Sequence, residues 1–252
     1  MREHLIRGQK KHRPTLVNNW EACYFDFDHN KLLQLGRDAA KYGIELLVVD
    51  DGWFGRRKDE TTSLGDWHVD KEKLPGGLKR LGDELNKSGV TLGVWMEPEM
   101  VSPDSDLYRT HPDFAMAHPD RSPTLARNQL VLDLVRKEVR DHVYQQISAV
   151  LRSAPIAYLK WDMNRPFTDL YSSSLPPERQ CETAHRYMLG VYELQERLVT
   201  DFPDLLLENC CSGGGRFDAG MLYYSPQIWT SDNGEAIDRL GIQEATALAY
   251  PF

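Results

Sequence analysis

One aspartate of this 252-residue chain stands where an apolar strand would turn directly into a charged segment. Residues 156–162 begin with the kind of apolar run expected of a buried parallel strand and end at Asp162. Lys160 lies two residues earlier, so in an extended strand both side chains point to one face. A neighbouring cation keeps a carboxylate ionised, which suits a nucleophile. Taken alone, the pattern fits a plain ion pair at a strand end equally well.

Carboxylates also follow other predicted strands, and together they could form a ring at one mouth. They are Asp50 and Asp51, Glu97 and Glu99, Asp162, Glu208, and Asp232. Two chemistries use such a ring. One is glycoside hydrolysis by an ionised and a protonated carboxyl. The other is a Mg²⁺ site of the enolase type. Asp232 has no neighbouring cation in sequence, so it can more readily be protonated and act as the acid.

The tryptophans help to separate these two chemistries. Five of the six lie at or beside predicted strand ends: Trp20, Trp53, Trp95, Trp161 and Trp229. Sugar rings present apolar faces that stack on aromatic rings, whereas an enolising metal site has no such need. The pattern therefore favours a sugar-binding mouth, although each single tryptophan could equally fill the core, because tryptophan is highly buried on average.

Strands and helices alternate along the whole chain. The predicted strands cover residues 14–20, 45–49, 90–94, 156–162, 205–207 and 227–230, and the predicted helices cover 31–42, 78–87, 134–151, 178–200 and 235–249. Long loops are expected at 56–75 and 101–132. Such alternation predicts parallel strands joined by right-handed crossovers.

Polar, chemistry-bearing residues at every strand end favour an α/β fold of the (β/α)8 TIM-barrel type over a doubly wound sheet. The six predicted strands indicate about six strand–helix units, and a closed barrel has eight. We therefore expect residues 1–252 to be a partial catalytic barrel domain, with about two further units beyond Phe252.

Composition excludes several classes of protein. A net charge of −8 and a pI near 5.5, without a basic patch, argue against a nucleic-acid partner. The sequence contains no apolar run long enough to span a membrane and no apolar leader, so a cytoplasmic location is expected. Four scattered cysteines do not form the spacing of a disulfide framework or a zinc site.

Five longer motifs contain these strand ends. They are Val-Asp-Asp-Gly-Trp-Phe-Gly at 49–55, Gly-Val-Trp-Met-Glu-Pro-Glu-Met at 93–100, Tyr-Leu-Lys-Trp-Asp-Met-Asn-Arg at 158–165, Cys-Ser-Gly-Gly-Gly-Arg-Phe-Asp at 211–218 and Trp-Thr-Ser-Asp-Asn at 229–233. In order and spacing, from about Trp20 onward, they resemble the barrel motifs of family 36 glycoside hydrolases, the microbial α-galactosidases. Members of that family carry β domains before and after the barrel, which we do not expect within residues 1–252, and are often homo-oligomers.

The resemblance implies a role for each matching residue. Asp162 matches the catalytic nucleophile and Asp232 the general acid/base of a retaining mechanism, which needs the two carboxyl groups about 5 Å apart. No metal or organic cofactor is implied. The matching ligands of the galactose hydroxyls are Asp50, Asp51, Arg127, Lys160 and Asn164. The matching walls of the sugar pocket are Trp20, Trp95, Cys210, Ser212 and Gly213.

Other features have plainer interpretations. Trp53 and Trp229 are included among the sugar-binding residues because they lie at strand ends. Glu97 and Glu99 are expected to be structural and to hold arginines at the mouth. The glycines at 213–215 are not followed by the Lys-Ser/Thr of a phosphate loop, so they are expected to let the backbone approach the sugar closely.

Alternatives within and outside the family stay open. The same fold and mechanism could serve an α-N-acetylgalactosaminidase or an enzyme that transfers galactose to sucrose. A catalytically inactive galactose-binding fragment is a second class, and a Mg²⁺ enolase-type enzyme is a third, disfavoured by the tryptophan-rich mouth. Within the family, Cys210 and the following glycines leave little room for an acetamido group, so an α-galactoside substrate is preferred.

Overall fold

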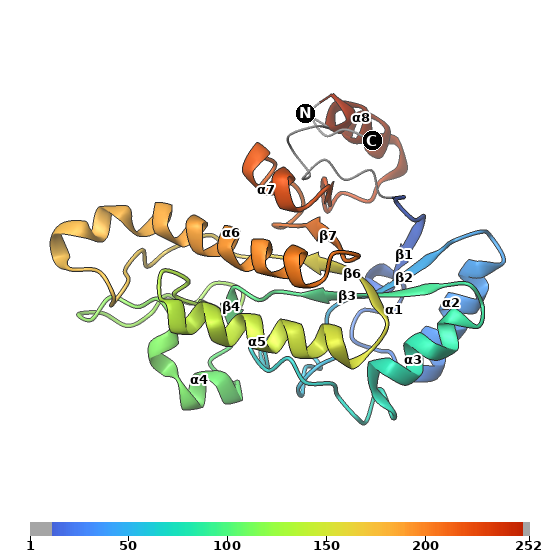
Figure 1. The fold of residues 1–252 in the computed structure, drawn as a ribbon, viewed down its shortest axis with the longest axis horizontal. Helices are drawn as coiled ribbons and strands as arrows, with labels where there is room; N and C mark the ends of the chain where they lie inside the picture. Colours follow the sequence, from blue (N-terminus) through green and yellow to red (C-terminus); the bar gives the residue numbers. More distant parts are fainter. Residues whose placement is uncertain (1–11, 249–252) are drawn as a thin grey trace.

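The computed structural model describes residues 12–248. Within that range, six parallel strands form one sheet in the spatial order β1-β2-β3-β6-β7-β8 (Figure 1). The parallel pairing confirms the prediction of strands joined by crossovers. The strands are β1 (Leu16–Asn18), β2 (Leu46–Val49), β3 (Thr91–Met96), β6 (Ile156–Trp161), β7 (Leu206–Asn209) and β8 (Gln227–Ile228).

All five predicted helices are present, with boundaries shifted by a few residues. They are α2 (His29–Ala40), α3 (Gly77–Asn86), α5 (Lys137–Ser153), α6 (Thr183–Asp201) and α8 (Ala236–Ala247). The α2 helix begins before the predicted position because the Asp28 side chain accepts a hydrogen bond from the Lys31 backbone N–H and caps the first turn. The start of the predicted 178–200 helix is instead a 3₁₀ turn, η3 (Pro177–Glu182), and Ala249 lies outside the described residues.

Several short elements do not follow from the sequence pattern. They are α1 (Trp20–Cys23), β4 (Met100–Val101), α4 (Asp106–Thr110), η2 (Pro112–Phe114), β5 (Leu130–Val131) and α7 (Ala219–Tyr224). The predicted loop at 101–132 therefore contains regular structure, and β4 pairs antiparallel with β5. These elements are too short to show a helical or strand period. The α7 helix supplies the crossover between β7 and β8.

The strands place side chains on two sides of the sheet. In β2, Leu47 and Val49 belong to the main hydrophobic core, whereas Leu46 and Val48 belong to a separate small cluster. Tyr158 of β6 and Leu206 of β7 complete that cluster. Because side chains alternate along a strand, the residues that follow this cluster toward the C-terminal ends lie on the same side. That side of the sheet carries the candidate site.

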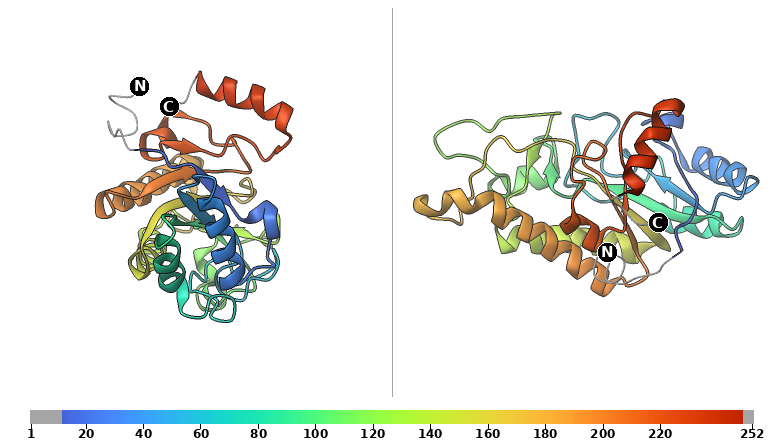
Figure 2. Two further views of the ribbon diagram at one scale, coloured as in Figure 1. Left: turned by 90° about the vertical axis from the view of Figure 1, so that its right-hand side faces the viewer. Right: turned by 90° about the horizontal axis from the view of Figure 1, so that it is seen from above.

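The helices cover the other side. Figure 1 shows α5 and α6 side by side along the sheet and α2 with α3 beside β2 and β3; α5 contacts α6, and α2 contacts α3. Figure 2 shows that α8 lies apart from α5 and α6, and none of its residues is buried. The curled parallel sheet with its helices matches part of a (β/α)8 barrel, and closure by eight strands stays a prediction.

Candidate active site

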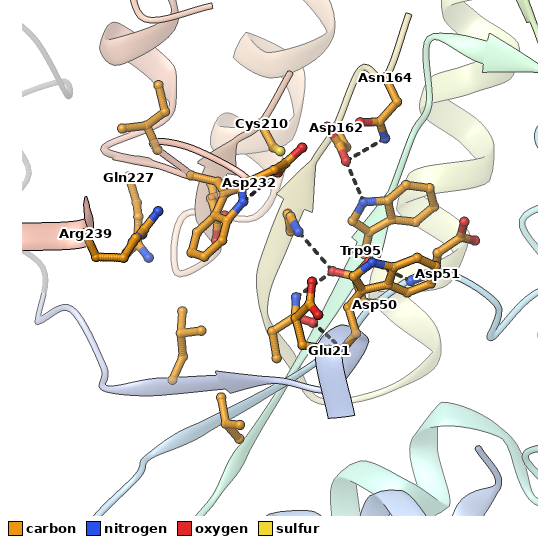
Figure 3. A pocket seen from close by; sticks show the side chains of 18 of the residues that line it. Glu21, Asp50, Asp51, Trp95, Asp162, Asn164, Cys210, Gln227, Asp232 and Arg239 are labelled. Carbon is orange, nitrogen blue, oxygen red and sulfur yellow. Dashed lines mark hydrogen bonds and ion pairs between the residues drawn. The ribbon is translucent and has the colours of Figure 1, made fainter. Parts of the chain in front are cut away.

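A cavity of about 600 Å³ lies at the C-terminal ends of the parallel strands, within the size range of small-molecule sites (Figure 3). Most of the predicted site residues line it. These are Trp20, Asp50, Asp51, Trp95, Arg127, Lys160, Asp162, Asn164, Cys210, Trp229 and Asp232. The two predicted catalytic carboxyl groups, from β6 and from the segment after β8, therefore share one cavity.

Strand register explains why residues distant in sequence meet here. Trp95 of β3 pairs with Lys160 of β6, and Lys160 pairs with Glu208 of β7. Backbone hydrogen bonds continue past the strand ends. The Asp162 N–H donates to the Met96 carbonyl, at 2.9 Å. The nucleophile candidate is thus fixed by the ladder of the central strands rather than by a loop.

Asp162 is 4% exposed and accepts several hydrogen bonds. Trp95 Nε1 and Asn164 Nδ2 donate to its Oδ2 at 3.0 and 2.7 Å, and the Met163 N–H donates to its Oδ1 at 2.8 Å (Figure 3). Donors aimed at a carboxylate stabilise its negative charge and fix its orientation. The Cys210 thiol also lies against it. Burial, and then the charge of Asp162, raise the pKa of Cys210, so this thiol stays protonated.

Lys160 forms its ion pair with Asp50 rather than with Asp162, although the charge of Asp162 also acts on it. Its Nζ lies 3.0 Å from Asp50 Oδ2, and Asn18 Nδ2 donates to the same oxygen at 2.5 Å. Burial disfavours the ammonium, yet the Asp50 and Glu208 carboxylates raise the pKa of Lys160 above its ordinary value. The lysine is therefore a cation. The common face of Lys160 and Asp162 is as predicted, but Asp50, which follows β2 two positions away in the sheet, supplies a closer carboxylate than Asp162.

The Asp51 carboxylate is held by a partner that the sequence did not indicate. Arg57 Nε and Nη2 donate to its two oxygens at 2.7 and 2.8 Å, in a buried bidentate pair. Arg57 Nη1 also donates to the Thr62 carbonyl at 2.7 Å, which ties the long loop after β2 to the site. Arg127, at the rim, pairs with Glu60 of that loop at 3.0 Å.

Asp232 lies in a different environment. Its side chain is exposed, and Trp229 Nε1 donates to its Oδ1 at 2.9 Å. The Trp229 ring lies beneath two cations, with Arg239 Cζ 4.5 Å and Lys160 Nζ 5.8 Å from its centroid. Trp229 therefore interacts both with Asp232, the acid/base candidate, and with Lys160.

Three predicted site residues lie outside the lining that the described residues form. Trp53 is fully buried, and its Nε1 donates to the Trp95 carbonyl at 2.9 Å, so it supports Trp95 and cannot touch a ligand in the cavity. Ser212 Oγ donates to Asn164 Oδ1 at 3.3 Å. Gly213, with a φ of +82°, packs against backbone: a Cβ there would lie 2.8 Å from Ser231 Cα. Its close approach is to the segment carrying Asp232 rather than to the cavity.

The two glutamates after β3 differ. Glu99 is fully buried and holds Arg216 at 2.7 Å, together with hydrogen bonds from Trp161 Nε1 and Tyr187 OH, which confirms its predicted structural role. Within residues 12–248, Glu97 accepts hydrogen bonds from the Asn164 backbone and side chain and from Gln129 rather than pairing with an arginine, so the prediction that Glu97 holds an arginine was wrong.

Several lining residues were not in the predicted set. They are Leu16, Val17, Asn18, Glu21, Glu60, Glu208, Gln227, Ile228, Arg239 and Gln243. Glu208 is the most informative, because burial raises its pKa and Tyr158 OH donates to it. Its position at a strand end was a usable signal. Asn18 was also detectable, as a polar residue ending β1, whereas Arg239 and Gln243 lie on α8, where strand-end reasoning does not reach.

Among residues 12–248, no group of three or more His, Cys, Asp or Glu side chains is arranged to hold a metal ion. In the same range, no helix is both long and apolar enough to cross a bilayer.

Comparisons with known proteins agree on one family. The family model described as Melibiase matches residues 1–252. The chain is 56% identical to α-galactosidase AgaA of Geobacillus stearothermophilus and 53% identical to α-galactosidase 1 of Pediococcus pentosaceus, in each case over 100% of this chain and 35% of the relative. The crystal structure of GH36 α-galactosidase AgaA superposes with a TM-score of 0.93 at 57% identity, covering 96% of this chain and 34% of that one.

The chain therefore spans about a third of the length of the curated relatives it matches. Structures of AgaA variants in complex with raffinose and with stachyose also match at 56% identity. The five motifs, the parallel sheet and the carboxylates at its C-terminal end agree with the match over the full chain, and this chain belongs to the melibiase family of family 36 glycoside hydrolases.

Proposed function

We propose that this chain provides the catalytic site of a retaining α-galactosidase, which hydrolyses terminal α-D-galactosyl residues of raffinose- and melibiose-type oligosaccharides. The observation that carries the proposal is that Asp162 and Asp232 line one cavity together with hydroxyl-binding side chains and tryptophans. The raffinose and stachyose bound to AgaA variants support the substrate class. A cytoplasmic location and a homo-oligomeric state remain part of this proposal.

The first step is attack by Asp162 on the anomeric carbon. The carboxylate oxygen forms a bond to that carbon while the glycosidic bond breaks, and Asp232 gives its proton to the leaving oxygen. The donors on Asp162 fix its orientation before the reaction. Preorganised polar groups of this kind cost no reorganisation at the moment of reaction.

The second step reverses these roles. Asp232, now a carboxylate, takes a proton from water, the water oxygen bonds to the anomeric carbon, and the bond to Asp162 breaks. Two inversions give net retention of the α configuration. The exposure of Asp232 fits this role, because water must reach the site of the second step.

We assign galactose recognition to charged side chains whose orientations are fixed by neighbouring side chains. Asp50 is held by Lys160 and Asn18, and Asp51 by Arg57, so these carboxylates present oriented acceptors to sugar hydroxyls. Trp95, 2% exposed, and Trp20 offer ring surface for the apolar face of the sugar. Arg127 and Asn164 are further donors in the cavity.

The test is hydrolysis of p-nitrophenyl α-D-galactopyranoside by the protein that carries these residues. We expect turnover, its loss in Asp162→Ala, and α-galactose as the first product in a proton NMR time course. A β first product would contradict the retaining mechanism. No turnover by a folded wild type would contradict the enzyme assignment. Galactose that still raised the melting temperature would then support the binding-fragment alternative.

Within the family, p-nitrophenyl α-N-acetylgalactosaminide and sucrose as galactosyl acceptor test the alternatives. The thiol of Cys210, 2% exposed and beside Asp162, fills space near the reacting centre, which favours an unsubstituted galactoside. We expect hydrolysis of the galactoside to exceed both alternative reactions. Activity that withstands EDTA is expected from a mechanism that uses two carboxyl groups.

A further inference from the structure

A buried carboxyl group behind the nucleophile has no role in the mechanism above. Glu97 follows β3, is 2% exposed and lies outside the cavity lining given by the described residues. Its Oε1 accepts hydrogen bonds from the Asn164 backbone N–H and, at 3.2 Å, from Gln129 Nε2. Its Oε2 accepts one from Asn164 Nδ2 at 3.3 Å. Glu97 therefore accepts hydrogen bonds from both the backbone and the side chain of Asn164.

Asn164 connects this carboxyl group to the nucleophile. The same Nδ2 that reaches Glu97 donates to Asp162 Oδ2 at 2.7 Å. On the other side of the amide, Asn164 Oδ1 accepts from Ser212 Oγ at 3.3 Å. Groups after β3, β6 and β7 thus fix the plane of one amide. Such a network restricts a side chain more than any one of its hydrogen bonds alone.

Building on the proposed function, we propose that Glu97 is a positioning residue for the glycosidase reaction: it holds Asn164 so that the amide fixes the Asp162 carboxylate toward the anomeric carbon. It touches neither substrate nor the reacting atoms. Two further donors, Trp95 Nε1 and the Met163 N–H, set the rest of the orientation of Asp162. A misplacement of the order of 1 Å at a reacting atom can cost about 100-fold in rate.

The charge state of Glu97 supports this role. The titratable and charged groups that act on it are Asp162 after β6, Arg57 from the loop after β2, and Cys211 after β7. Burial, and then the Asp162 charge, raise the pKa of Glu97 to about 8. At neutral pH Glu97 is therefore uncharged. Above a pH of about 8 it becomes a carboxylate, which competes with Asp162 for the one Asn164 Nδ2.

The first test compares Glu97→Ala and Glu97→Gln with wild type on p-nitrophenyl α-D-galactopyranoside. We expect kcat to fall about 100-fold in Glu97→Ala, with KM changed less than about threefold, because orientation is lost and substrate contacts are not. The Gln side chain of Glu97→Gln is uncharged and has nearly the same shape as a protonated Glu, so this variant should retain most of kcat at pH 7. Asp133→Asn, which removes a buried carboxyl group hydrogen-bonded to Ser172, is the matched control and should keep wild-type kcat.

The second test is the pH profile of kcat/KM with 2,4-dinitrophenyl α-D-galactopyranoside. Its leaving group needs no proton, so ionisation of Asp232 as the acid does not enter the measured step. We expect wild-type kcat/KM to fall as the pH rises through about 8, and this fall to disappear in Glu97→Gln. A purely structural glutamate would leave the shape of the profile unchanged.

The outcomes separate the two proposals. A folded wild type without α-galactosidase turnover would overturn the proposed function and this inference with it. An active wild type with full kcat in Glu97→Ala would overturn the inference alone. If Glu97→Ala does not fold, as judged by circular dichroism, Glu97→Gln decides the question, and an unchanged alkaline fall in that variant overturns the inference.

Discussion

The two candidate catalytic carboxyl groups share one cavity but sit in contrasting surroundings. Asp162 ends a central strand, is 4% exposed and accepts hydrogen bonds from Trp95, Asn164 and the Met163 backbone. Asp232 follows the short strand β8, is exposed, and accepts a hydrogen bond from Trp229. One is held by the core of the sheet, and the other by a surface segment.

The contrast matches the demands of the two chemical roles. A nucleophile must hold one orientation toward the anomeric carbon, which a buried strand end provides. An acid/base must exchange a proton and admit water, which needs access. The consequence is that the position of Asp232 depends on packing between loops, above all on Gly213 against Ser231, whereas that of Asp162 depends on the strands themselves.

The largest effect is expected for Asp162→Ala. Removing the nucleophile should lower kcat by roughly 10⁴-fold or more. Added azide, entering the space left by the carboxylate, should restore turnover of an activated substrate and give β-galactosyl azide, identified by NMR. An α-galactosyl azide product would instead place Asp162 on the acid/base side of the sugar.

A smaller and substrate-dependent effect is expected for Asp232→Ala. General acid catalysis contributes about 10²- to 10⁴-fold, and this contribution should be lost in glycosylation by raffinose, measured as kcat/KM. With a dinitrophenyl leaving group, kcat/KM should change little, and azide should yield the α-galactosyl product. An equal loss of kcat/KM with both substrates would contradict the acid role of Asp232. The proposed difference in role between Asp232 and Asp162 would then be wrong.

Gly213→Ala tests whether loop packing positions the acid. A Cβ at 213 would lie 2.8 Å from Ser231 Cα and 3.0 Å from the Asp232 nitrogen. We expect raffinose turnover to fall about tenfold or more, because even a displacement of the order of 1 Å at a catalytic group is costly. Gly43→Ala is the control, since it has a similar φ of +75° with no atom within 4 Å of the added Cβ. If both variants lose activity equally, the contact with Ser231 is irrelevant.

The smallest effect is expected on the free energy of unfolding, through the buried Glu97 carboxyl group. Glu97 has a pKa raised from 4.5 in the unfolded chain to about 8 in the fold, so the folded state binds the extra proton between these pH values. The free energy of unfolding of wild type should therefore decline as the pH rises through this window. Glu97→Gln does not titrate.

The melting temperature of Glu97→Gln relative to wild type should thus rise by a few degrees between pH 5 and pH 8.5. Glu72→Gln, at an exposed glutamate, serves as the control and should show a constant difference. A constant difference for Glu97→Gln as well would show that Glu97 is ionised throughout and gains no proton on folding in this pH range.

Much of the framework was predictable because it rests on local patterns. Apolar runs such as 46–49 are buried on both faces in a parallel sheet, and they were recognisable without knowledge of their neighbours. Polar residues that follow such runs must emerge at the C-terminal edge, and eleven of the predicted site residues line the cavity there. The missed helices, such as α4 and α7, are too short to show a period.

Partners across strands could not be predicted. Sequence proximity suggested that Lys160 lies beside Asp162 and keeps it ionised, but the curl of the sheet brings Asp50, from the end of β2 two positions away, within 3.0 Å of the Lys160 ammonium. Trp53 also lies in a segment that follows a strand, yet it is buried and its Nε1 donates to the Trp95 carbonyl. Glu97 and Glu99 are two residues apart and have unrelated partners, Asn164 and Arg216.

The sequence by itself determined the parallel α/β architecture, the family motifs and the strand ends from which chemistry could arise, because alternation and apolar runs are local properties of the chain. Only the tertiary structure decided which cation meets which carboxylate, which tryptophan faces the cavity, and that a second carboxyl group lies behind Asp162. The physical reason is that charge pairing, burial and hydrogen bonding depend on distances between strands, and these are fixed by register and by side-chain packing.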